Sequence, residues 1–148
     1  MLFNIYINSC ITELERLAHA KAAATGGVPF GLYVPAAAGD AFDMLLSLWF
    51  ADDSSVVETD IGRLQWLVDT LGDLLRLIGL LMNILKTKLL ITMGQMAKHG
   101  PSPGVICLKV YGSVETVTEF PHLGTMLNSR ELERCVVCIK TEGVLSLP

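Results

Sequence analysis

Two adjacent carboxylates stand between apolar runs in the sequence SLWFADDSSVV, which covers residues 47–57. Asp52 and Asp53 would repel each other by roughly 1 kcal/mol in water at a separation of about 4 Å, and by more where water is partly excluded. A divalent cation would offset this repulsion, and Mg²⁺ or Mn²⁺ held by carboxylates and substrate phosphates supports two-metal phosphoryl transfer. The pair is therefore a candidate catalytic metal site, although aspartates also occur in tight turns with no further role.

The segments around the two aspartates predict a β-hairpin. Residues 44–50 are apolar except for one serine and predict a buried strand, and residues 54–58 predict a second strand. The chain between them has room only for a tight turn, so Ala51 and both aspartates are expected at its tip. Their side chains would then project beyond the end of the sheet.

Two helices are expected. The clearer one has Asp60 as its N-terminal cap, apolar side chains with a 3.6-residue period from Leu64 to Ile78, and Gly79 at its C-terminal end. Residues 2–17 predict another helix, broken or bent near Asn8.

The other segments predict short strands in an α+β fold. Residues 130–148 show no recognisable pattern, so we expect a domain over residues 1–129 and an unassigned tail. An antiparallel sheet with helices on one face accounts best for the order of the elements. Strands are expected at residues 31–34, 80–84, 88–93 and 119–129, and in a hairpin that joins 105–110 to 114–117.

Composition favours a globular intracellular protein. Hydrophobic residues make up 51% of the chain and charged residues 18%, which excludes a disordered chain. The apolar stretch of residues 71–93 is interrupted by charges too often to span a membrane. No cationic leader is visible, and four cysteines are too few for a disulfide framework. Cys135 and Cys138 form a single CxxC, which favours ordinary thiols over a zinc site.

The charge distribution leaves one segment suited to phosphates. Residues 1–79 hold four Lys/Arg and ten Asp/Glu, a net charge of −6. Residues 80–130 hold five Lys/Arg and two Asp/Glu, a net charge of +3. Residues 131–148 hold two Lys/Arg and three Asp/Glu, a net charge of −1. Any contact with phosphates is therefore expected in residues 80–130.

Four blocks of this sequence resemble the reverse transcriptases of non-LTR (LINE-type) retrotransposons. LWFADDSSVV resembles their FADD or YADD active-site hairpin, and MLFNIYINSCITELE resembles the LLFNIYINDL run after the template-positioning glycines. IGLLMNILKTKLL resembles the GLKINxxKTK segment, and VTEFPHLGTMLNS resembles the VxxFKYLGxxLxS stretch near the primer grip. The blocks follow the family's order and cover residues 1 to about 129, which implies the C-terminal part of the palm domain.

The resemblance implies a role for each matching residue. Asp52 would be the main ligand of Mg²⁺ or Mn²⁺, with Asp53 in support and Phe50 against the primer end. Lys86 and Lys88 would lie near the incoming dNTP, with a solvated pair of charges as the alternative. The primer-grip block comprises Phe120, His122, Leu123 and Gly124. The resemblance implies that this block contacts the primer. The alternative is that it forms a packed strand and turn, and for His122 this alternative is favoured over direct contact with the primer.

The chain also departs from the family pattern. The resemblance requires a third catalytic aspartate, fingers and a thumb, and no segment of residues 1–148 resembles them. Ser54 stands where the family usually has a large aliphatic residue, and Pro121 replaces the usual lysine. We therefore expect a fragment of an RNA-directed DNA polymerase that is inactive alone, from a parent that binds an RNA template, a DNA primer and dNTP.

The alternative is a noncatalytic remnant or a partner-binding module. A palm sheet that lacks two of its strands would expose an apolar edge and face, which predicts self-association through that surface. No membrane partner is expected.

Overall fold

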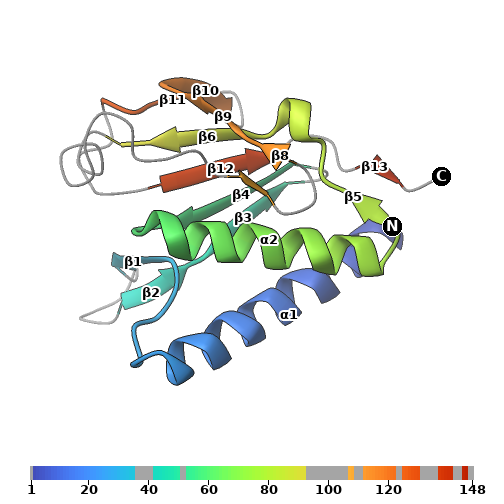
Figure 1. Cartoon of the computed structure of the whole chain (residues 1–148), viewed down its shortest axis with the longest axis vertical. Coiled ribbons are helices and arrows are strands. Elements are labelled where there is room, and N and C mark those ends of the chain that lie inside the picture. Colours follow the sequence, from blue (N-terminus) through green and yellow to red (C-terminus); the bar gives the residue numbers. More distant parts are fainter. Residues whose placement is uncertain are drawn as a thin grey trace.

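Two helices cover one face of a five-stranded sheet in this α+β structure, a computed structural model (Figure 1). The expected fold class is confirmed. None of the described helices is long and apolar enough to cross a membrane. The structure describes residues 2–35, 42–50, 53–92, 107–108, 112–122, 125–130, 137–141 and 145–146.

The five-stranded sheet is mixed, with one strand from the C-terminal part of the chain at its centre. Each strand of the sheet is antiparallel to its neighbour except for the parallel pair β6 and β9. The order across the sheet is β3 (Ser47–Phe50), β4 (Asp53–Glu58), β12 (Val137–Thr141), β6 (Lys88–Ile91) and β9 (Glu115–Val117).

Four small antiparallel pairs complete the described strands. They are β1 (Leu32–Pro35) with β2 (Phe42–Leu45), β5 (Leu80–Leu81) with β13 (Leu145–Ser146), β7 (Cys107–Leu108) with β8 (Gly112–Ser113), and β10 (Glu119–His122) with β11 (Thr125–Asn128).

The first helix, α1 (Leu2–Ala24), is continuous, so the predicted break near Asn8 is wrong. The helix also continues past residue 17, where the prediction ended it. Its buried positions recur every three or four residues, and its later part is rich in alanine, the strongest helix former. This unbroken stripe packs against the second helix and comprises Ile7, Cys10, Leu14, Ala18 and Ala22.

The second helix, α2 (Ile61–Leu77), begins and ends where the sequence predicts. The Asp60 carboxylate accepts a hydrogen bond from the Arg63 N–H at 2.9 Å and caps the N-terminus. At the other end Gly79 has φ +77° and donates its N–H to the Arg76 carbonyl at 3.0 Å. The buried residues of this helix are Leu64, Leu67, Val68, Leu71, Gly72 and Leu75.

Removing the N-terminal cap of α2 should destabilise the protein measurably. We expect Asp60→Ala to lower the free energy of unfolding by about 1 kcal/mol, because the Arg63 N–H loses its acceptor. Urea unfolding followed by circular dichroism measures the change. Asp73→Ala, at an exposed position in the same helix, is the control and should have a much smaller effect. Equal effects of the two variants would contradict the capping role.

Tertiary contacts divide the predicted strand 44–50 into β2 and β3. The interruption falls at Leu46, whose carbonyl accepts a hydrogen bond from the Val57 N–H at 3.0 Å. Gly31 approaches the same point, where an added Cβ would come within 2.5 Å of the Leu45 carbonyl oxygen. Its φ of +95° also requires glycine. As a result β2 pairs with β1, and β3 pairs with β4.

Several other predicted strands differ in extent or pairing. The segment 80–84 is extended only at Leu80–Leu81, and Ile84–Lys86 form a short 3-10 turn, η1. Residues 115–117 pair in parallel with β6, so the hairpin partner of Cys107–Leu108 is Gly112–Ser113 instead. The segment 119–129 is itself a hairpin, β10–β11. The prediction at 88–93 is confirmed for Lys88–Ile91.

The sheet has a hydrophobic core on each face. Val56, Leu89 and Ile91 pack against the two helices in the larger core. Their neighbours along the strands, Val57 and Leu90, pack on the other face with residues of the small hairpins. Because side chains alternate along a strand, β4 and β6 each serve both cores. Both faces of the central strands are therefore covered.

Candidate functional site

The hairpin β3–β4 places one of the two aspartates at a defined position. Phe50 and Asp53 are directly opposite each other, so the turn between them has only two residues, 51 and 52. Asp53 is the half-buried first residue of β4 and not part of the turn, which corrects the prediction of both aspartates at the tip. Asp52 lies outside the described residues.

Alternation along β4 defines the face on which Asp53 lies. Ser55 and Val57 share a face with Asp53, whereas Val56 belongs to the core under the helices. The Ser55 hydroxyl lies 3.4 Å from Nδ1 of His122, and Val57 packs with Phe120. Asp53 therefore lies on the face of the sheet that is covered by the β10–β11 hairpin.

The two lysines predicted to bind nucleotide line one cavity. Lys86 is exposed in η1, and Lys88 is half-buried at the start of β6. The cavity has a volume of about 300 Å³ and joins the lysine segment to the start of the β10–β11 hairpin; its other lining residues are Leu85, Val117, Glu119, Phe120 and Pro121. Two blocks about 30 residues apart in the sequence thus meet at one place.

The charges at this cavity are partly neutralised. The Lys88 ammonium group forms an ion pair with the Glu115 carboxylate across the parallel pair β6–β9. Glu119 adds a further negative charge to the lining. Among the described residues Lys86 has no carboxylate within ion-pair distance, so it is better placed than Lys88 to meet a phosphate.

The register across the sheet relates this cavity to the aspartate hairpin. Ser55 is opposite Lys140 of β12, and Lys140 is opposite Lys88 of β6, so these residues form one row. With strands about 4.8 Å apart, β4 and β6 are separated by about 10 Å, and Asp53 lies about 7 Å further along β4. Asp53 and Lys88 are therefore about 12 Å apart at their backbones, near the same end of the sheet.

The predicted primer-grip block is described only in part. Phe120 is buried, and His122 is half-buried with its ring edge-on to Phe120 at a centroid distance of 6.4 Å. Phe120 therefore anchors the β10–β11 hairpin on the sheet, while Pro121 is exposed at the cavity. Leu123 and Gly124 lie outside the described residues.

Glu58, a buried carboxylate for which the sequence predicted no role, holds the C-terminal end of β4 in place. Glu58 is fully buried, and its side chain accepts hydrogen bonds from the Gly31 N–H at 3.0 Å and from the Thr59 N–H at 2.6 Å. Arg63 of α2 donates to it at 3.2 Å and stacks over the Phe30 ring at 4.1 Å. Because these donors satisfy the carboxylate, Glu58 holds β4, α2 and the loop before β1 together.

The Glu58–Arg63 pair had a weak signal in the sequence. Glu58 ends an apolar strand and precedes Arg63 of the next helix by five residues. This spacing is compatible with an ion pair on the surface as well as with a buried one. Only the approach of residues 29–31, which add the Gly31 N–H and the Pro29 carbonyl, makes this pair a buried one.

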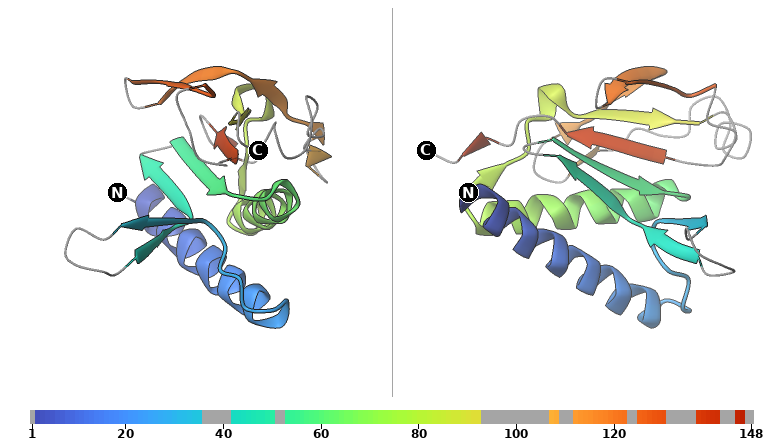
Figure 2. Two further views of the ribbon diagram at one scale, coloured as in Figure 1. Left: turned by 90° about the vertical axis from the view of Figure 1, so that its left-hand side faces the viewer. Right: turned by 180° about the vertical axis from the view of Figure 1, so that it is seen from behind.

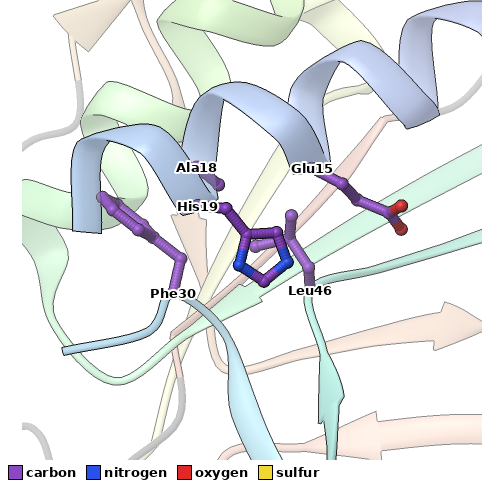
Figure 3. Close-up of a pocket in the computed structure, with 5 residues that line it drawn as sticks. All are labelled: Glu15, Ala18, His19, Phe30 and Leu46. Carbon is purple, nitrogen blue, oxygen red and sulfur yellow. The ribbon is translucent and has the colours of Figure 1, made fainter. Parts of the chain in front are cut away.

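A second, smaller cavity lies between α1 and the start of the sheet (Figure 3). It holds about 60 Å³ and is lined by Glu15, Ala18, His19, Phe30 and Leu46. Figure 3 shows the Glu15 carboxylate pointing away from the imidazole of His19. The two titratable side chains do not converge on a common point, so this cavity is not a candidate acid–base site.

The part of the chain that the structure describes contains no cluster of three or more His, Cys, Asp or Glu side chains able to hold a metal ion. Of the two predicted metal ligands the structure describes Asp53, and its carboxylate oxygens are donors of the kind that Mg²⁺ prefers. Comparisons with protein-family models, with curated proteins and with solved structures found no match to this chain.

Proposed function

We propose that the chain is part of the palm of an RNA-directed DNA polymerase of the non-LTR retrotransposon type. The observation that carries this proposal is the tight β3–β4 hairpin, in which Phe50 faces Asp53 across a two-residue turn. Asp53 begins β4 at the end of a sheet whose other face packs against the two helices, and Asp52 precedes it in the sequence. The reverse transcriptases that this sequence resembles carry their FADD or YADD active-site motif in a hairpin.

The cavity beside β6 gives the proposal a second support. The lysine block and the primer-grip block match separate family segments, and Lys86, Lys88 and Phe120 line the same cavity of about 300 Å³. In the proposed site Asp52 and Asp53 would hold Mg²⁺ or Mn²⁺, which would supply Lewis-acid stabilisation of phosphoryl oxygens. Lys86 meets a phosphate of the dNTP, and Phe120 holds the β10–β11 hairpin in position against the primer.

Metal binding tests the hairpin part of the proposal. We expect the chain to bind Mn²⁺ with a dissociation constant of about 10⁻³ M, the weak end of carboxylate sites, and Asp52→Asn to weaken binding about tenfold. Water-proton relaxation during a Mn²⁺ titration measures both values. Asp73→Asn removes one charge from an exposed position on α2 and should leave binding unchanged. Equal affinities for the Asp52→Asn variant and the unchanged chain would contradict the proposed site.

Primer extension tests the activity of the chain by itself. We expect no extension of a DNA primer on an RNA template with either metal, because the carboxylates and the template contacts supplied by the rest of the parent each contribute several kcal/mol to transition-state stabilisation. Manganese-dependent extension that disappears in Asp52→Asn would overturn the expected inactivity and would strengthen the proposed ancestry.

A further inference from the structure

The central strand of the sheet comes from the C-terminal part of the chain. β12 is antiparallel to both β4 and β6, so β4 and β6 run parallel to each other with one strand position between them. Together β4, α2 and β6 form a split β-α-β unit. Figure 1 shows β12 lying in the space between these two strands, and the rear view in Figure 2 shows the same arrangement.

The two strands on either side of β12 are held in place by other elements. β4 is also paired with β3, and β6 with β9, on the sides away from β12. Val56 of β4 and Leu89 and Ile91 of β6 pack with the buried face of α2 in a single core. Because β4 and β6 are about 10 Å apart, they cannot form hydrogen bonds with each other unless one of them moves. The rest of the structure thus forms a slot that is one strand wide.

The occupant of the slot is paired along both of its edges. The main backbone contacts of β12 are with β4, β6 and η1, and the next described strand along the chain, β13, pairs with β5. Its register is set by five residues paired with β4 and four paired with β6. A copy of this strand from another molecule would make the same pairings in the same register, because identical sequences offer identical hydrogen-bonding groups and side chains.

We propose that the C-terminal segment carrying β12 and β13 is exchangeable, and that the slot between β4 and β6 accepts β12 from a second copy of the chain while β13 pairs with β5 of that copy. The product is a strand-exchanged dimer. The monomer and the dimer share the intramolecular contacts and differ mainly in the chain entropy of the connection, so protein concentration during folding selects between them. This inference rests on the sheet topology alone and does not depend on the proposed function.

The first experiment refolds the full chain from denaturant at low and at high protein concentration and measures molar mass by gel filtration with light scattering. We expect monomer at low concentration, and at high concentration a dimer that persists after dilution, because its release requires β12 to leave the slot. Ile139→Pro should abolish the dimer, since proline is not accommodated in a strand paired on both sides. Ile139→Val keeps a β-branched residue at the same position and should dimerise like the unchanged chain.

Two outcomes would overturn the proposal at this stage. One is a chain that remains monomeric after refolding at every concentration. The other is an Ile139→Pro chain that dimerises as well as the unchanged one, which would assign the contact to another surface such as the outer edge of β3.

Hydrogen exchange of the unchanged chain covers the case in which Ile139→Pro does not fold. An exchangeable strand leaves the slot while the rest stays folded, so the amides of residues 137–141 should exchange together, at least about tenfold faster than those of residues 64–75 in α2. Equal protection of the two segments would overturn exchange by the folded chain, because β12 would then be released only by global unfolding.

Discussion

Replacing Glu58 by alanine should lower the free energy of unfolding by about 3–5 kcal/mol. The carboxylate is fully buried, and it holds the Arg63 guanidinium, the Gly31 N–H and the Thr59 N–H at once. Its removal leaves a largely desolvated positive charge and two backbone donors without their acceptor. Denaturant unfolding followed by the fluorescence of the two tryptophans measures the loss.

Glu115 provides a matched control for the Glu58 experiment. It also forms an ion pair with a basic side chain, Lys88, but 65% of its side chain is exposed to solvent. Solvent screens this pair, so Glu115→Ala should change the free energy of unfolding by less than about 1 kcal/mol. Comparable losses in the two variants would show that Glu58 does not form the buried network described above.

The Glu58 network also bears on the proposed metal site, because β4 carries Glu58 at one end and Asp53 at the other. A slip of this strand by one residue would move every side chain to the opposite face of the sheet. The hydrogen bonds that Glu58 accepts therefore keep β4 in register and keep Asp53 on the face shared with Ser55 and Val57. In a Glu58→Ala chain that remains folded, weaker Mn²⁺ binding would indicate that this register matters for the hairpin.

Replacing Leu67 by alanine should lower the free energy of unfolding by about 3–5 kcal/mol. Leu67 is completely buried in the middle of α2, between α1 and the strands of the sheet. The substitution removes the transfer free energy of the lost side-chain atoms and leaves a cavity that the rigid elements on both sides cannot fill. Thermal unfolding and urea titration should agree on the size of the loss.

Leu77 lies in the same helix and serves as the control for Leu67. Its side chain is 82% exposed, so Leu77→Ala should change the free energy of unfolding by no more than about 0.5 kcal/mol. Alanine is at least as good a helix former as leucine, so neither substitution costs helix propensity, and the difference between them reports burial. A small difference would mean that α2 does not pack on the sheet as described.

The candidate site was partly predictable from the sequence. The hairpin is a local structure, and two apolar runs separated by a few polar residues were sufficient to predict it. The cavity that joins Lys86 to Phe120 was not predictable from spacing, because it arises where η1 and β10 approach each other across β6. The place of Asp53 at the start of β4, and not in the turn, depended on the register of the strand pair.

The amino-acid sequence by itself determined the elements whose signals are local. α2 is one of these, since its cap residue, its 3.6-residue apolar period and its terminal glycine all lie within 20 residues of the chain. The helical part of α1 also followed from its periodicity, although its continuity past Asn8 was missed, because two exposed polar residues do not interrupt a buried stripe.

Only the tertiary structure decided the elements that depend on distant partners. The break at Leu46 arises from the approach of Gly31 and Val57, which are 15 and 11 residues away in the sequence. β12 is the clearest case, because the five residues VCIKT have no distinctive pattern and yet complete the sheet between β4 and β6. A short strand obtains its stability from the ladders on both sides, and its neighbours here are contributed by residues 53–58 and 88–91, far from it along the chain.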